Sequence, residues 1–157
     1  DEKKAAGISE VVMQSFPDQR LYTSSHNADG SVASTARTLA DVNVVDKDGK
    51  AVLDSDGNQL VTLGVKSSLK NEVKNQQASL LSQTDWAIIR KADKGAAIPS
   101  NIQTWRDAIR TKATEMETAI DNAADTAAVE ALFLKWTTDS DGKTTKSGIL
   151  YDWPELG

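Results

Sequence analysis

Short runs of apolar residues separated by turn formers fill residues 36–65, and this pattern predicts strands. Two Asp-Gly steps, Asp48-Gly49 and Asp56-Gly57, lie between runs rich in Val and Leu. Such steps favour tight hairpin turns, because Gly adopts the positive φ that these turns need and Asp tolerates it. We therefore expect a three-stranded antiparallel meander over about 40–46, 50–54 and 58–65. A sheet of three short strands is only marginally stable alone, so we expect another part of the structure to pack against one of its faces.

The apolar spacing changes to three or four residues from residue 67 onward, which predicts helices. The first segment, 67–94, has an apolar stripe at Leu69, Val73, Leu80 and Leu81. The stripe weakens at Thr84-Asp85, where a new turn can be capped, and a shorter apolar face follows. That face consists of Trp86, Ile88 and Ile89.

A break at residues 95–99 precedes the clearest amphipathic pattern in the chain, which predicts a helix from about 100 to 124. Its apolar positions are Ile102, Trp105, Ile109, Ala113, Met116 and Ile120. We expect them to be buried against the helix that carries Leu69, Val73 and Leu80. A last helix begins at Asp125 or Thr126, with one apolar face made of Val129, Leu132, Phe133 and Trp136.

The remaining segments carry weaker patterns. The spacing of Ile8, Val11, Val12 and Phe16 is compatible with a short helix in residues 1–19, which we interpret as a docking arm. Residues 20–35 are interpreted as a loop around a short strand at 21–23, because turn formers dominate 24–31. Residues 137–148 predict a mobile loop or the tip of a small hairpin, and 149–154 predict an extended aromatic segment.

These patterns predict an α+β fold: a small antiparallel β meander, a helical hairpin, a short third helix and an extended C-terminal tail. We expect four parts in chain order. They are an N-terminal arm and loop (1–35), a β section (36–65), a helical module (66–136), and a loop with a C-terminal aromatic anchor (137–157).

The composition excludes several kinds of chemical site but does not by itself identify a function. The 157 residues include no Cys and one His, which excludes disulfides, thiolate catalysis and multi-His metal sites within the chain. Acidic residues outnumber basic ones in both halves of the chain, and the net charge is −5. We therefore expect no broad basic patch that could bind a nucleic acid backbone. No apolar run is long enough to span a membrane, and we expect no signal peptide, because no apolar block follows Asp1 and Glu2.

Three Asp-x-Asp-Gly pieces raise the question of calcium. When each Gly is set at position 6 of an EF-hand loop, the acids required at positions 1 and 12 are missing. Those places hold Val44 and Ser55, Val52 and Leu63, and Thr137 and Gly148. We interpret the pieces as turns, and we expect neither a metal site nor a cofactor.

Other polar groups give no catalytic set. His26 has Asp29 and several Ser residues nearby, but the stretch lacks the strained elbow and oxyanion hole of a serine hydrolase, so a small hydrolase is only a third option. Acidic residues near the end of the long helix fit a solvated face better than paired catalytic carboxylates. These are Glu115, Glu117, Asp121 and Asp125.

The four Trp residues all lie in the second half. Trp105 and Trp136 fall on helical apolar stripes, so a core role is favoured over a stacking surface for sugars or bases. Trp153 stands beside Pro154 in the terminal segment and must dock, either on this chain or on another. We favour a neighbouring protein as the dock.

Three sequence blocks follow one another in a recognisable order. They are Leu80-Leu81-Ser82-Gln83-Thr84-Asp85-Trp86, then Trp105-Arg106-Asp107-Ala108-Ile109-Arg110, and a closing Tyr151-Asp152-Trp153-Pro154. This order resembles the tail assembly chaperone family of tailed bacteriophages over about residues 69–157. Two departures are a longer connector after Arg110, with an extra helix, and the absence of the family's usual Pro before the final Trp block.

The resemblance implies a non-enzymatic structural or assembly protein of a bacteriophage tail or tail fibre. Its partners would be other tail proteins, including copies of itself in a symmetric assembly, with no nucleic acid and no membrane. It would be found in the virion tail, and in the host cytoplasm during assembly. The residues expected to bind partners are Tyr151, Trp153, Pro154, Arg106, Arg110 and Asp85. Arg106 and Arg110 lie one turn apart on the predicted helix, and Asp85 can meet one of them. The alternative is a carbohydrate-binding module at a fibre tip, which exposed Trp side chains would favour.

Overall fold

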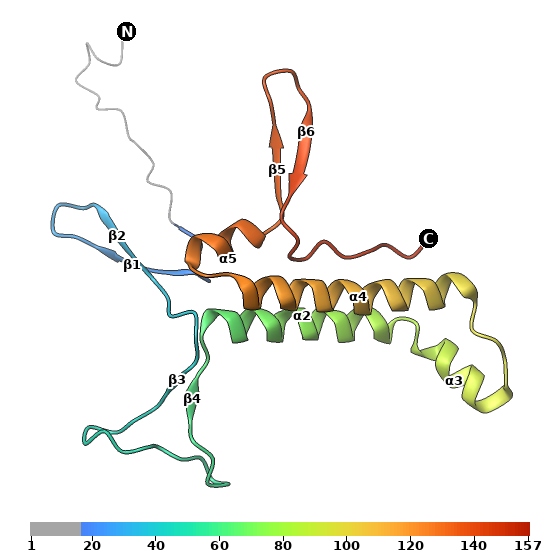
Figure 1. The fold of residues 1–157 in the computed structure, drawn as a ribbon, viewed down its shortest axis with the longest axis horizontal. Helices are drawn as coiled ribbons and strands as arrows, with labels where there is room; N and C mark the ends of the chain where they lie inside the picture. Colours follow the sequence, from blue (N-terminus) through green and yellow to red (C-terminus); the bar gives the residue numbers. More distant parts are fainter. Residues whose placement is uncertain (1–16) are drawn as a thin grey trace. The chain divides into compact units, whose positions relative to one another are not determined.

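The computed structural model describes residues 17–157, which fall into two compact units divided between Arg37 and Thr38. Figure 1 shows the elements of each unit. The short helix expected around Ile8 to Phe16 lies outside the described residues. The structure confirms an α+β fold with antiparallel strand pairs and helices. No helix in the described part of the chain is long and apolar enough to cross a membrane.

The first unit contains a hairpin where the sequence predicted mostly loop. Strand β1 (Tyr22–His26) pairs antiparallel with β2 (Val32–Ala36), with His26 opposite Val32. The turn is closed by the Asn27 amide, which donates to the Ser31 carbonyl at 2.8 Å. The expectation of a loop over 24–31 was therefore wrong for its first half. Thr and Ser pair well across strands, and their count as turn formers concealed this.

The second unit begins with the β section, where the expected meander is split into short pairs. Strand β3 (Val42–Asn43) pairs with β4 (Val61–Thr62), and single bridges join Val45 to Ala51 and Leu53 to Gln59. The two expected Asp-Gly turns are present, with Gly49 and Gly57 at positive φ. In each turn an Asp carboxylate accepts backbone N–H groups, as Asp46 does from Asp48 and Lys50.

Three residues of the β section close a ring of backbone hydrogen bonds. The amide of Val44 donates to the Leu60 carbonyl, Leu60 donates to Val52, and Val52 donates to Val44, at 2.8, 2.8 and 3.0 Å. The Gln59 side-chain amide lies within 2.8–3.2 Å of the same three carbonyl oxygens. Each carbonyl has two lone pairs, so it can accept both bonds. We call this arrangement the carbonyl ring.

The β section joins the helices at a close backbone crossing. A Cβ on Gly64 would lie 2.4 Å from backbone atoms of Leu39 and Ala40, so only Gly fits there. The first N–H groups of the following helix, which have no intrahelical partner, donate to the Thr38 and Leu39 carbonyls. Asp41 accepts from the Gly64 amide at 2.8 Å and from the Ser67 hydroxyl at 3.0 Å.

Two long helices form the core of the second unit and lie side by side in Figure 1. Helix α2 spans Val65–Ser82 and α4 spans Ser100–Asn122. The predicted apolar stripes are buried at their contact, as expected, except that Leu80 and Leu81 are half-buried. The buried residues are Leu69, Val73, Ile102, Trp105, Ile109, Ala113, Met116 and Ile120. Ion pairs flank the contact, including Lys70 with Asp121 at 2.8 Å.

Two shorter helices and a hairpin complete the second unit. Helix α3 (Asp85–Lys94) follows α2, and α5 (Thr126–Leu132) follows α4 with the Asp125 carboxylate as its N-cap. Strands β5 (Lys135–Thr138) and β6 (Thr144–Ser147) form a hairpin, which is one of the two alternatives left open for 137–148.

Trp136 corrects the sequence interpretation. It lies on β5 and is 64 % exposed, whereas Val129 and Phe133 of the same expected helical face are buried. Helix α5 ends at Leu132 because the returning chain occupies its end. The Leu132 carbonyl accepts the amides of Ile149 and Leu150, both at 2.8 Å. The helical module therefore ends four residues before the expected boundary at 136.

Candidate functional site

The Arg106 guanidinium connects the first two sequence blocks. Its Nη1 donates to the Leu81 carbonyl at 2.7 Å, to the Thr84 hydroxyl at 2.8 Å and to Asp85 Oδ1 at 2.9 Å. Arg106 lies on α4 and is only 7 % exposed, while the Asp85 side chain at the start of α3 is 52 % exposed. The guanidinium thus fixes the junction between α2 and α3 against α4.

The opposite edge of the same guanidinium is not satisfied within the described residues. Arg106 Nε is buried and has no hydrogen-bond partner there. A buried donor without an acceptor costs about 1–3 kcal/mol relative to a paired one. The Nε and Nη2 N–H groups point the same way from the planar group, in the geometry that binds a carboxylate with two bonds. The site is therefore short of one acceptor.

Arg110 lies one turn further along α4 but takes no part in that junction. It forms an exposed ion pair with Asp107 at 2.9 Å. Exposed pairs of this kind contribute about 0–1 kcal/mol. The structure therefore brings Asp85 and Arg106 together, as the sequence suggested for this arginine pair, and leaves Arg110 at the surface.

The closing aromatic block packs on α2 and α4 of its own chain. The Tyr151 hydroxyl donates to Glu72 Oε2 and the Trp153 indole donates to Gln76 Oε1, each at 2.7 Å. The Trp105 indole on α4 donates to the Pro154 carbonyl at 2.8 Å. Leu150 is fully buried and Trp105 is buried, while Tyr151 and Trp153 are half-buried.

These contacts correct the preference for a neighbouring protein as the dock. The middle of α2 offers two polar side chains at a suitable spacing, because Glu72 and Gln76 lie one turn apart. An extended chain that runs along the helix pair can therefore satisfy one indole and one phenol in turn. The expected extended conformation is interrupted at its start by a turn, in which the Asp152 amide donates to the Ile149 carbonyl at 3.3 Å and Tyr151 has φ +69°. Residues 152–154 form neither helix nor strand.

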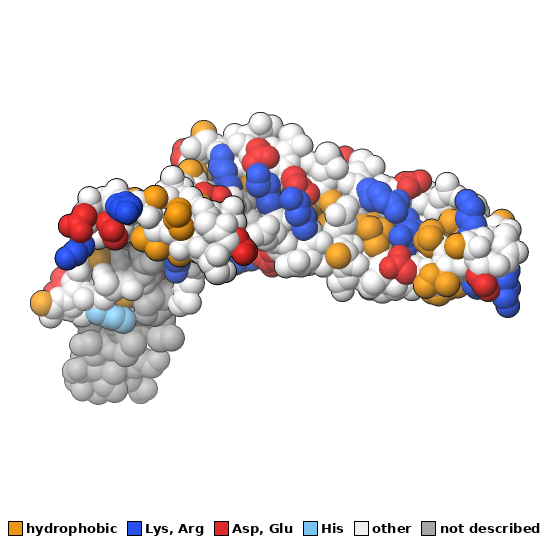
Figure 2. All heavy atoms as spheres, turned by 90° about the horizontal axis from the view of Figure 1, so that it is seen from below, with side chains coloured by type: hydrophobic (Ala, Val, Ile, Leu, Met, Phe, Trp, Pro, Cys, Tyr) orange, Lys and Arg blue, Asp and Glu red, His pale blue; other side chains and the backbone are white. Residues whose placement is uncertain are grey.

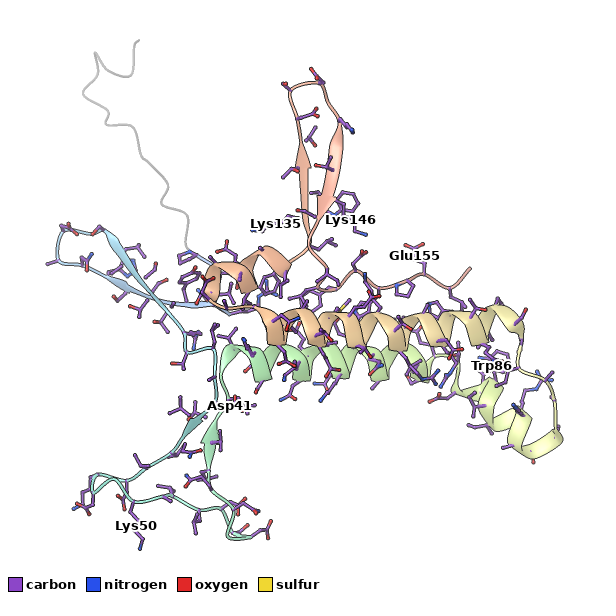
Figure 3. All side chains as sticks on the ribbon, viewed as in Figure 1. Asp41, Lys50, Trp86, Lys135, Lys146 and Glu155 are labelled. Carbon is purple, nitrogen blue, oxygen red and sulfur yellow. The ribbon has the colours of Figure 1, made fainter. Side chains whose placement is uncertain are left out.

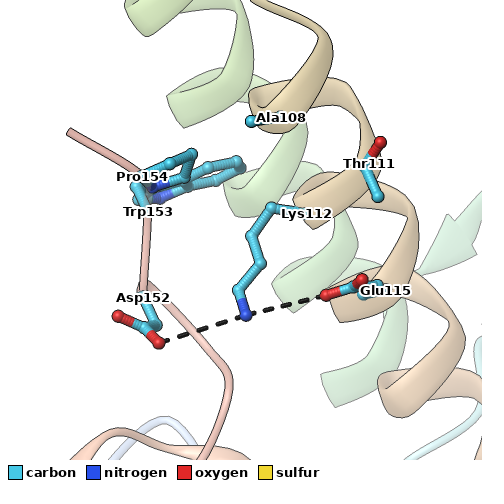
Figure 4. Close-up of a pocket in the computed structure, with 7 residues that line it drawn as sticks. All are labelled: Ala108, Thr111, Lys112, Glu115, Asp152, Trp153 and Pro154. Carbon is cyan, nitrogen blue, oxygen red and sulfur yellow. Dashed lines mark ion pairs between the residues drawn. The ribbon is translucent and has the colours of Figure 1, made fainter. Parts of the chain in front are cut away.

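A groove of about 420 Å³ remains beside this segment (Figure 4). One wall is α4, and the other is the segment itself. Lys112 spans the groove and pairs with Glu115 at 3.6 Å and with Asp152 at 4.0 Å. The lining residues are Ala108, Thr111, Lys112, Glu115, Asp152, Trp153 and Pro154. The groove is thus an ion-paired seam between the tail and the helix.

Besides Trp136 and Leu156, two parts of the second unit each expose several large apolar side chains. On α3, Trp86 is 46 % exposed and Ile89 is also exposed, with Arg90 over the Trp86 ring at 5.9 Å. Figure 2 shows hydrophobic side chains at the surface of the end where α3 lies. The β section exposes Val42, Val45, Leu53, Leu60, Val61 and Leu63. Contiguous surfaces of this kind are typical of binding sites.

The other candidates from the sequence are the residues around His26 and the three Asp-x-Asp-Gly pieces. His26 lies on β1, while the neighbouring Asp29 accepts from the Ser31 hydroxyl and amide, and these bonds lower the pKa of Asp29. Within residues 17–157 no group of three or more metal-ligating side chains is gathered. The Asp-x-Asp-Gly pieces form turns, as interpreted.

The carbonyl ring and Gln59 escaped the sequence interpretation. Their signal was present, because Val44, Val52 and Leu60 recur every eight residues with an Asp-x-Asp-Gly turn between successive members. A strand is predicted from the alternation of apolar and polar residues within one short segment. That alternation carries no information on the spacing between one strand segment and the next.

Comparisons with known proteins add nothing to this geometry. No family model, curated protein or solved structure matches the chain.

Proposed function

We propose that this chain is a non-enzymatic structural or assembly protein of a bacteriophage tail or tail fibre, which acts by binding other tail proteins. The proposal begins from the resemblance of three sequence blocks to the tail assembly chaperone family. It places the protein in the virion tail, and in the host cytoplasm while tails assemble.

One observation carries the proposal: the three blocks meet on α4. Arg106 of the second block contacts Leu81, Thr84 and Asp85 of the first, and Trp105 of the second block binds Pro154 of the third. Blocks that match only by chance have no reason to form contacts with one another. Their convergence supports the interpretation of the blocks as one folded unit.

The exposed apolar residues support a binding role. The α3 surface and the β section project from the paired helices (Figure 1), and both expose large aliphatic side chains. Side chains of this kind are stable in a soluble assembly when a partner covers them. Tail proteins and further copies of this chain are the partners that the proposal implies.

The proposal is tested by fractionation of phage lysates with quantitative proteomics. We expect the chain in purified tails, or in a complex with a tail protein that precedes them. A tagged Ile89→Asp variant should lose that association, while Lys47→Gln, which changes an exposed charge on a β turn, should keep it. Absence from tails and from all complexes with tail proteins would contradict the proposal.

A second candidate is a carbohydrate-binding module at a fibre tip, and the exposure of Trp136 favours it. The ring lies at the base of the β5–β6 hairpin and is 64 % exposed, with Lys146 Nζ at 5.6 Å from its centre. Figure 3 labels Lys135 and Lys146 at this base. An open indole face is a common stacking surface for sugar rings.

Tryptophan fluorescence distinguishes the two candidates. A carbohydrate module should show saturable quenching by host surface glycans, and Trp136→Ala should abolish it while Trp86→Ala leaves it unchanged. If the chain is a tail-binding protein without glycan affinity, glycans should cause no saturable quenching of tryptophan fluorescence in the wild type or in either variant.

A further inference from the structure

A basic hollow of about 160 Å³ lies between α3 and the N-terminal half of α4. Its walls come from α3, from the connection that follows, and from α4. The lining residues are Ile88, Lys91, Ile98, Gln103, Arg106, Asp107 and Arg110. The hollow is separate from the groove beside the C-terminal segment, which has no lining residue in common with it.

The charges of the hollow favour an anion. Three cations, Lys91, Arg106 and Arg110, face one lining carboxylate, Asp107, and that carboxylate already binds Arg110. The Arg106 charge is also shared with Asp85, but only through Nη1. One more carboxylate would balance the lining charge.

Arg106 supplies the specific recognition element. Its Nη1 is fully engaged by α2 and α3, so the guanidinium is held in one orientation. Its buried Nε finds no acceptor among residues 17–157. The Nε–H and Nη2–H groups on one edge of a fixed guanidinium can donate two parallel hydrogen bonds to a carboxylate, and little conformational entropy is lost because the guanidinium is already held in place.

We propose that this hollow binds the carboxylate of a Glu or Asp side chain on a different protein, presented next to an apolar residue. The proposal rests on the protein-binding function proposed above and names the chemistry of that contact. Arg106 binds the carboxylate, while Lys91 and Arg110 at the rim attract it.

The apolar walls favour a peptide segment over a free anion. Ile88 and Ile98 line the hollow, and α3 also exposes Trp86 and Ile89. An inorganic anion would gain nothing from these side chains. A segment with a carboxylate between apolar residues would gain both the charged hydrogen bonds and burial of apolar surface.

The test uses the full chain and capped synthetic tripeptides, acetyl-Leu-Glu-Leu-amide and its Gln counterpart. Nitrogen-15 NMR follows the Nε–H resonance of Arg106, which reports directly on a new acceptor. We expect the Glu peptide to shift this resonance in a saturable way, with an affinity at least about tenfold higher than that of the Gln peptide. Equal binding of the two peptides would overturn the proposal.

A double variant tests the rim. Lys91→Gln with Arg110→Gln removes two exposed charges and leaves the α2–α4 core intact, so the fold should persist. We expect the Glu peptide to bind this variant at least about tenfold more weakly than the wild type. The matched control, Lys47→Gln with Lys143→Gln, removes two charges from turn tips and should bind like the wild type. Unchanged affinity in the rim variant would overturn the assignment.

Two further arms identify the ligand source. Acetate and inorganic phosphate should shift the Arg106 resonance only at concentrations well above that of the peptide, and equal potency would overturn a peptide ligand. A shift that follows protein concentration alone would assign the hollow to a second copy and would also overturn the proposal. If the peptide binds but the chain is absent from tails, the site stands and the tail function fails.

Discussion

Two arginines one turn apart on α4 have very different surroundings. Arg106 is buried and holds the α2–α3 junction through three acceptors, whereas Arg110 pairs with Asp107 in solvent. Sequence reasoning identified both as candidates, and it proposed that Asp85 could meet one of them. It could not say which, because both positions neighbour the apolar stripe and only the position of α3 distinguishes them.

Replacement of Arg106 by Met should lower the free energy of unfolding by about 2–3 kcal/mol. The change removes the charged donor that joins Leu81 and Thr84 to α4, and hydrogen bonds to a charged group contribute about 1.5–3 kcal/mol. The Leu81 carbonyl keeps its bonds from the Thr84 amide and hydroxyl, at 3.1 and 3.2 Å. Urea unfolding followed by circular dichroism measures the loss. Arg110→Met is the matched control and should change stability by less than about 0.5 kcal/mol. Equal effects of the two changes would contradict the structural role of Arg106.

Asp41 should make stability depend on pH in the acid range. Backbone hydrogen bonding from Gly64 and the Ser67 hydroxyl lower the pKa of Asp41 in the folded state. A lowered pKa means that the contribution is fully present above the pKa of the unfolded chain and is lost as pH falls through the folded pKa. Urea midpoints measured from pH 7 to pH 2 should fall less steeply for Asp41→Asn. Asp48→Asn, on an exposed turn, should leave the slope unchanged.

Short-range sequence patterns account for most of the helices and turns that were predicted correctly. The three-to-four-residue spacing gave the α2 and α4 stripes, and the Asp-Gly steps gave the turns. Both signals lie within about a dozen residues of sequence. The carbonyl ring and the end of α5 depend on residues further apart, such as Leu132 and Ile149, and no local pattern contains them.

Gly148 should be the least replaceable glycine of the β5–β6 region. It has φ +87°, and a Cβ there would lie 2.2 Å from the Phe133 carbonyl oxygen. Gly148→Ala should therefore cost about 3 kcal/mol or more, because strain at positive φ adds to a backbone clash. Gly142→Ala, at φ +79° in open space, should cost only about 1 kcal/mol. Thermal unfolding of the two variants compares these costs, and similar melting temperatures would contradict the close crossing.

At the scale of the whole chain, the C-terminal segment completes the second unit. The sequence indicated that Trp153 in the terminal segment must dock, but a neighbouring protein was favoured over this chain as the surface. The observed surface depends on Glu72 and Gln76, polar residues of α2 that the apolar pattern does not mark. Hydrogen bonding by half-buried polar residues is therefore the information that hydrophobic pattern alone does not provide.

Truncation after Ser147 should destabilise the helix pair. It removes the fully buried Leu150, which alone contributes about 1.5–3 kcal/mol, and it leaves the Trp105 indole without its acceptor. The melting temperature should fall by several degrees. Truncation after Glu155 removes only exposed residues and serves as the control. If the chain ending at Ser147 melts like the full chain and binds tail proteins equally well, the segment is not an anchor.

The carbonyl ring also bears on aggregation. Exposed apolar strands are hazardous when their free N–H and C=O groups can pair with a strand of another molecule. At Val44, Val52 and Leu60 every amide hydrogen and one lone pair of each carbonyl are used inside the ring, and the two hydrogens of the Gln59 side-chain amide are directed at the same carbonyls. At that level the β section can present Val45 and Leu53 to a partner while offering no template to a foreign strand. At these three residues the backbone therefore has no amide hydrogen left with which to extend a sheet into another molecule.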